Sequence, residues 1–105
     1  MKIKKFETFT KSFVSFVKVT TDTGEFGYGQ MSTYHADITA QIFHKQVAPW
    51  VLGTPCNDFE DLENFILEKE HKFPGSYVLR AIAGLDTALW DMKGRIEKKP
   101  VVSLL

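Results

Sequence analysis

The spacing of the apolar residues changes once along this chain, near residue 34, and this change constrains the fold more than any other feature. Before it, Phe, Val and Thr are frequent and no helical period is found, which is typical of strands. After it, apolar residues recur at intervals of three and four, as on the buried stripe of a helix. Because 105 residues are enough for one core only, we expect a single α+β domain.

Three strands are expected, over residues 2–9, 12–21 and 25–31. Between the last two, Asp22, Thr23 and Gly24 form a short connection that suits a type I turn with Gly24 left-handed, which predicts an antiparallel hairpin. Residues 12–21 place apolar side chains on both faces of the strand, so we expect cover on both faces of the sheet. The sequence therefore predicts a three-stranded antiparallel meander.

Three helices are expected after the strands, packed on one face of the sheet. Pro49 should end the first helix, since proline lacks a backbone donor. Asn57 should cap the second, with Glu60 three positions later completing the capping pair. Ser76 should cap the third and longest helix, and Pro100 should begin a further helix that the chain is too short to complete. The apolar stripe of the third helix is predicted to consist of Val78, Ile82, Leu85, Leu89, Met92 and Ile96.

Composition excludes several classes of function. Thirteen Lys and Arg balance thirteen Asp and Glu, so no electrostatic surface for nucleic acid is expected. Apolar stretches are far shorter than the roughly 18 to 20 residues that span a bilayer, so no membrane partner is expected. Cys56 is the only cysteine and cannot form an intrachain disulfide, and no apolar leader precedes the first lysines. We therefore expect a cytoplasmic protein.

Two motifs resemble known sites but lack the neighbouring structural elements that such sites require. The Gly27-Tyr28-Gly29 segment is similar to the start of a dinucleotide-binding loop, but it lies within a strand, so close backbone packing is the favoured interpretation. Glu68 and His71 have the spacing of helical metal ligands, but no facing helix supplies a second pair, and an exposed pair is favoured. We expect no catalytic residue and no metal ligand within this chain.

The polar segment 32–37 separates the last strand from the first helix and contains Tyr34, His35 and Asp37. Loops held by a rigid scaffold are where ligand contacts concentrate, which would make Tyr34 and His35 substrate-binding residues. Alternatively, Thr33 or Asp37 caps the helix and His35 is merely exposed. The residues alone leave both interpretations open.

The long helical segment and its continuation resemble the mandelate racemase and muconate lactonizing branch of the enolase superfamily. The likeness extends over essentially the whole chain, including the hairpin at 19–29, and is most specific in the pattern Ala81-x-Ala83-Gly84-Leu85-Asp86-x-Ala88-Leu89-x-Asp91-Met92-x-Gly94-Arg95, followed by Pro100-Val101-x-x-Leu104-Leu105. The resemblance covers the N-terminal capping domain only. At Lys98 the family commonly has glycine, and a left-handed lysine there would cost about 1 kcal/mol.

The resemblance implies that residues 1–105 are the capping domain of a longer enzyme whose C-terminal (β/α)₈ barrel is absent from this chain. That barrel would hold Mg²⁺ on three acidic ligands and provide Lys or His bases, which abstract a proton beside a carboxylate. The cofactor would belong to the full-length enzyme, and the isolated chain would be inert. The implied partners are a carboxylate-bearing small molecule, the barrel domain of the same polypeptide and further copies in a homo-oligomer.

In this family the loops of the capping domain shape substrate specificity, and they correspond here to residues 9–12 and 31–37. The first loop is short, which is similar to acid-sugar dehydratases. The resemblance thus implies a dehydratase of a sugar acid, with Tyr34 and His35 lining the substrate pocket. The alternatives are a racemase or cycloisomerase of the same superfamily, or a binding or assembly module without catalysis. Whichever of these the protein is, the faces that a partner covers should be apolar and exposed in this chain.

Overall fold

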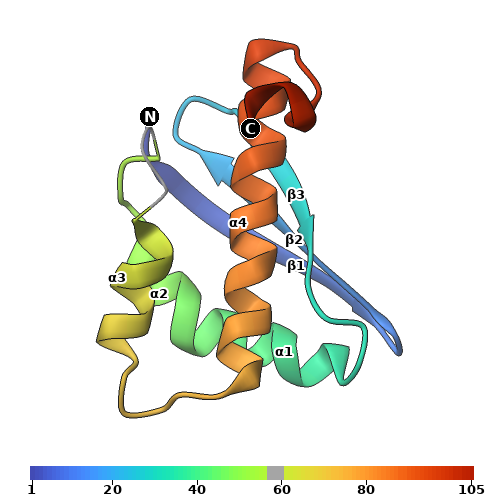
Figure 1. Ribbon diagram of the computed structural model, residues 1–105, viewed down its shortest axis with the longest axis vertical. Coiled ribbons are helices and arrows are strands. Elements are labelled where there is room, and N and C mark those ends of the chain that lie inside the picture. The colour runs from blue at the N-terminus through green and yellow to red at the C-terminus, as the bar shows by residue number, and fades with distance from the viewer. Residues whose placement is uncertain (57–60) are drawn as a thin grey trace.

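The computed structural model describes residues 1–56 and 61–105 and contains one antiparallel sheet with helices on one side (Figure 1). The strands are β1 (Ile3–Lys11), β2 (Val14–Thr21) and β3 (Phe26–Gln30), in the spatial order β1-β2-β3. Gly24 has a φ of 89° and its amide donates to the carbonyl of Thr21 at 3.1 Å, closing the turn between β2 and β3. The predicted α+β meander is confirmed.

The helical part of the chain is more divided than the sequence suggested. It consists of α1 (Ala36–Ile42), a π-helical turn η1 (Phe43–Val47), α2 (Ala48–Val51), α3 (Leu62–Lys69), α4 (Ser76–Glu97) and a 3₁₀ helix η2 (Val101–Leu104).

Pro49 does not end the first helix, so that prediction is wrong. The backbone widens into the π-helical turn η1 before it, and Pro49 then lies in the first turn of α2, where a helix needs no amide donor from it. The helical run continues to Val51 and ends at Leu52 and Gly53, which has a φ of 83°. A π-helical turn followed by a new first turn therefore lets a proline sit within a continuous helical segment.

The other predicted helix ends have mixed outcomes. The predicted cap of Asn57 with Glu60 lies outside the described residues. Ser76 is the first residue of α4 and makes no capping hydrogen bond, so its predicted role is wrong. Pro100 precedes only the short 3₁₀ helix η2. Lys98 has a φ of 54°, which confirms a left-handed end to α4 at a non-glycine residue.

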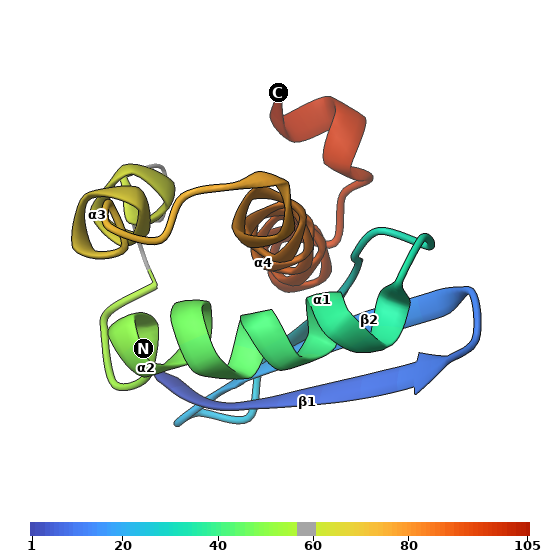
Figure 2. The same cartoon turned by 90° about the horizontal axis from the view of Figure 1, so that it is seen from below.

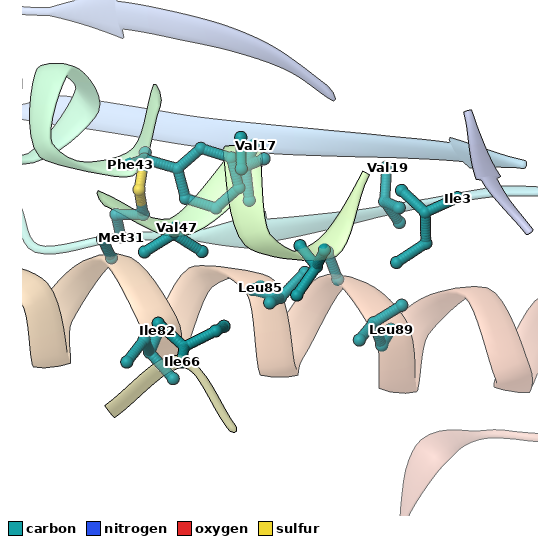
Figure 3. Packing of buried hydrophobic residues seen from close by; sticks show 14 of the residues in the cluster. Ile3, Val17, Val19, Met31, Phe43, Val47, Ile66, Ile82, Leu85 and Leu89 are labelled. Atoms are coloured by element: carbon teal, nitrogen blue, oxygen red, sulfur yellow. The ribbon is translucent and has the colours of Figure 1, made fainter. Parts of the chain in front are cut away.

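Helices α1 and α4 cover the same face of the sheet, which we call the inner face (Figure 2). The side chains of β2 that point to it alternate along the strand and are buried: Ser15, Val17, Val19 and Thr21. Val17 and Val19 pack toward Leu85 and Leu89 of α4 (Figure 3). The predicted stripe of α4 is confirmed except at its last member, because Ile96 is 40% exposed beyond the edge of the core.

The opposite face of the sheet, which we call the outer face, is apolar and open. Phe9, Phe16, Phe26 and Tyr28 are each more than a third exposed there. Within the described residues no helix covers this face, so the predicted cover on this side does not come from them (Figure 2). The amine of Lys18 lies 5.0 Å from the ring centroid of Phe26, so a cation partly shields the aromatic surface.

Across the described ranges, none of the helices combines the length and the apolar character that crossing a bilayer would require.

Candidate functional site

The approach of β3 to α4 is so close that it requires glycine. A Cβ at Gly27 would collide with the carbonyl oxygen of Ala88, and a Cβ at Gly29 would collide with that of Gly84. The two glycines therefore serve backbone packing, as the sequence analysis favoured over a dinucleotide-binding loop. We call this contact, formed by Gly27 and Gly29 with Gly84, Ala88 and Met92, the β3–α4 seam.

The seam continues beyond the end of β3. Strand and helix run in opposite directions, so later residues of the chain after β3 meet earlier residues of α4. Met31 packs its Cγ against Gly84, where a side chain would leave it no space. One turn earlier on α4, Nη1 of Arg80 donates to Oγ of Ser32 at 2.7 Å. Gly27, Gly29 and Ser32 thus meet successive turns of the helix, at Ala88, Gly84 and Arg80. After these contacts the chain leaves the core through residues 31–35, which we call the β3–α1 loop.

Tyr34 and His35 lie side by side at the end of the β3–α1 loop. Their ring centroids are 4.0 Å apart in an edge-on arrangement, and Tyr77 of α4 lies 6.4 Å from the His35 ring. Tyr34 is 64% exposed and His35 is also exposed. The structure therefore presents two polar aromatic side chains to solvent from a loop anchored on α4.

His35 has φ 52° and ψ 49°, a left-handed conformation that costs a non-glycine residue about 1–2 kcal/mol. It is the N-cap of α1, and no side chain forms a capping hydrogen bond there, so the capping role considered for Thr33 and Asp37 is wrong. The carbonyl of His35 instead accepts from the amides of Ile38 and Thr39. Strained residues of this kind persist where the surroundings hold them, and they cluster at ligand sites.

The turn between β1 and β2 lies at the same end of the sheet as the β3–α1 loop (Figures 1 and 2). Strand β1 extends to Lys11, so the turn is Ser12 and Phe13 rather than the predicted loop over 9–12. Phe13 is 71% exposed at its tip. The two loops that the family resemblance singled out therefore share one end of the domain, and the first is shorter than the sequence indicated.

The described residues do not provide a site for a metal ion. Nowhere in 1–56 and 61–105 do three His, Cys, Asp or Glu side chains come together in a suitable arrangement. Glu68 and His71 are exposed, and the His71 ring hydrogen-bonds through Nδ1 to the Glu68 carbonyl at 2.9 Å. These residues therefore do not fit the Mg²⁺ that the family resemblance implies, and no chemical step through a metal is assigned to them.

Cys56 is buried and does not have the surroundings of a nucleophile. Its Sγ lies 3.4 Å from the carbonyl oxygen of Met1, to which a protonated thiol can donate. Burial raises the pKa of the Cys56 thiol, so the reactive thiolate is disfavoured at neutral pH.

Sequence reasoning missed two polar residues of α4 that act on β3 and its loop. Oδ2 of Asp91 accepts from the amide of Tyr28 at 2.8 Å and from Nε of Arg95 at 2.9 Å, so it holds the edge of β3 as well as forming the predicted helix pair. Arg80 is the second. A signal was present: Arg80 and Asp91 lie on the helix face that includes Gly84 and Ala88, at spacings of three and four.

The fold and the seam define a small α+β domain, and comparison with known proteins identifies its family. Residues 3–105 match the family model described as the mandelate racemase / muconate lactonizing enzyme N-terminal domain. The chain belongs to this family, as the sequence resemblance indicated.

Individual relatives agree with this assignment. A D-mannonate dehydratase of Sphingomonas sp. is 32% identical over 96 residues, which are 90% of this chain and 24% of that protein. A crystal structure from Roseobacter denitrificans, of a protein provisionally named a racemase, is 56% identical with a TM-score of 0.95 and covers 99% of this chain and 28% of its own. A magnesium complex of a mandelate racemase/muconate lactonizing protein from Paracoccus denitrificans is 27% identical with a TM-score of 0.86, over 98% of this chain and 30% of its own.

This chain therefore spans about a quarter of the length of the curated relatives that it matches.

Proposed function

We propose that this chain is the capping domain of a magnesium-dependent dehydratase of sugar acids, and that its β3–α1 loop contributes to substrate choice. The observation that carries the proposal is the exposed Tyr34–His35 pair, with His35 held left-handed at the end of the sheet where both loops lie. The relative from Sphingomonas supports the dehydratase activity. Proton abstraction beside the substrate carboxylate is assigned to the barrel of the complete protein, as are the magnesium ligands.

Tyr34 and His35 would bind the polyhydroxylated part of such a substrate. A tyrosine hydroxyl and an imidazole each donate and accept hydrogen bonds, which suits the hydroxyl groups of a sugar acid. Their ring faces offer apolar surface to its C–H groups. A site that hydrogen-bonds a particular hydroxyl rejects stereoisomers that leave its polar groups unpaired.

The test is a screen of the complete protein with Mg²⁺ against D-mannonate and its stereoisomers, followed by variants of His35. We expect loss of water to give a keto-deoxy acid, and we expect His35→Ala to lower kcat/KM by at least tenfold, the effect of a lost hydrogen bond to substrate. His44→Ala is the matched control, because His44 is exposed on η1 and hydrogen-bonds only within the domain, to Thr8. Unchanged kinetics in His35→Ala would remove His35 from the pocket.

A racemase is the second candidate, and it is favoured by the 56% identity to the structure from Roseobacter denitrificans. Both activities begin with removal of the proton beside the carboxylate, but only the dehydratase expels water. Incubation in D₂O separates them, since a racemase returns the intact acid with deuterium at that carbon. Deuterated substrate without any keto acid would establish the racemase and contradict the dehydratase.

Self-association of the chain remains a prediction, and the open outer face gives it a physical basis. Sedimentation of the purified chain tests it, and a monomer at all concentrations would contradict it.

A further inference from the structure

Arg80 stands at the point where α4 meets the β3–α1 loop. It lies one turn before Gly84, which packs on Met31, and three residues after Tyr77, which lies beside His35. Its side chain is half-buried, and Nη1 donates to Oγ of Ser32 at 2.7 Å. A short hydrogen bond from a guanidinium to a hydroxyl is among the stronger contacts that one residue can give to a loop.

Ser32 links this contact to the rest of the loop through a second hydrogen bond. Its Oγ lies 3.4 Å from the carbonyl oxygen of Tyr34 and donates to it while accepting from Arg80. The hydroxyl therefore connects the rigid helix to the peptide between Tyr34 and His35. That peptide leads directly into the left-handed His35, whose conformation requires support from its surroundings.

We propose that Arg80 is a positioning residue that holds Tyr34 and His35 in their binding arrangement through Ser32. The inference rests on the proposed function, which places these two side chains in the substrate pocket. It assigns to a helix residue the role of holding the binding residues of the loop in place. Arginine suits the role because its planar, always charged group reaches from a fixed helix and keeps its orientation, whereas lysine offers only a point charge on a flexible stem.

Hydrogen exchange on this chain tests the positioning role without any substrate. The amides of Ile38 and Thr39 donate to the His35 carbonyl at 3.0 and 3.1 Å, so their exchange reports opening of the loop end. We expect about tenfold faster exchange at both amides in Arg80→Ala and in Ser32→Ala, the effect of one lost hydrogen bond to a charged group. Arg80→Lys should give a smaller increase.

Arg95→Ala is the matched control, because Arg95 lies on the same side of α4, at its far end, and pairs with Asp91. It should leave the exchange of Ile38 and Thr39 unchanged. The buried Leu85 amide serves as a reference for global unfolding in every variant. Unchanged exchange at Ile38 and Thr39 in Arg80→Ala would overturn the proposal, as would an equal acceleration at Leu85, which would indicate general destabilisation.

Kinetics of the complete protein on the sugar acid that it turns over provide the second test. A substrate that binds only the ordered loop has its apparent affinity reduced by the ordered fraction, so KM in Arg80→Ala should rise by as much as that fraction falls, while kcat stays constant. The rise cannot exceed the factor measured by exchange, and Arg80→Lys should recover part of it. A fall in kcat, or a larger rise in KM, would mean that Arg80 contacts substrate itself and would overturn the positioning role.

The two proposals fail differently. If the wild-type protein converts no sugar acid, the proposed function fails, while the exchange experiment still decides whether Arg80 holds the loop.

Discussion

The inner and outer faces of the sheet are built from alternate residues of the same strands, yet they differ in packing and exposure. On β3, Gly27 and Gly29 face inward and allow backbone contact with α4, while Phe26 and Tyr28 face outward with more than a third of their surfaces exposed. On β2, Val17 and Val19 are fully buried and Phe16 is 40% exposed. Stability is therefore concentrated on one face, and the other is available for contacts beyond this chain.

The strongest test of this contrast is Gly29→Ala. The added Cβ would collide with the backbone carbonyl of Gly84. Relieving this collision requires a shift of β3 or α4, because no flexible side chain is involved that could rotate away. We expect a loss of about 3 kcal/mol or more in the free energy of unfolding, measured by urea denaturation followed by circular dichroism. Gln30→Ala, the exposed neighbour on β3, is the control and should be nearly neutral. Equal stability of the two variants would contradict the seam.

A matched pair of valines compares the faces with identical chemistry. Val19→Ala removes two methyl groups from a fully buried site and should cost about 2 kcal/mol. Val14→Ala removes the same groups from the outer face, where Val14 is 37% exposed, and should cost less than about 0.5 kcal/mol. The same denaturation experiment measures both, and a larger loss at Val14 would reverse the assignment of the faces.

Asp91→Ala tests the hydrogen bond between α4 and the backbone at the edge of β3. It removes the acceptor of the Tyr28 amide and the partner of Arg95. Because Asp91 is half-exposed, we expect a loss of only about 1 kcal/mol. Asp86→Ala, an exposed carboxylate on the same helix, is the control and should be neutral. If the two variants are alike, the bond to Tyr28 contributes nothing.

The smallest expected effect concerns the cations over the outer aromatic rings. Lys18 and Arg95 both lie near Phe26, at 5.0 and 4.9 Å from its centroid. Exposed pairs of this kind contribute about 0.5 kcal/mol, so a double-mutant cycle of Lys18→Ala with Phe26→Ala should give a coupling of that size. A cycle with Lys11→Ala in place of Lys18→Ala should give none. Coupling in both cycles would point to a general charge effect.

The sheet was predictable from sequence because local signals decide it. The frequency of Phe, Val and Thr in the first 31 residues and the glycine at position 24 define the strands and the hairpin without reference to the rest of the chain. The course of the chain around Pro49 was not predictable in the same way. A π-helical turn leaves no clear mark in the spacing of apolar residues, and a proline normally indicates a break.

The candidate site was predictable in position but not in construction. Tyr34 and His35 were recognisable as polar residues in a loop between two elements. Their anchor was not, because Arg80 is 48 residues away from Ser32 and becomes its neighbour only through the seam. Ile96 shows the reverse case, since it continues the apolar stripe but lies beyond the sheet that would bury it.

The seam also determines where this domain tolerates changes in chain length. Inserting one residue within 27–31 would exchange the faces of β3 and drive a side chain into the backbone of α4. Past Ser32 the backbone no longer packs on α4 in this register, so changes in residues 33–35 should disturb the core less than changes within 27–31. Divergence towards new ligands would therefore accumulate in those few positions while the framework beneath them stays constant.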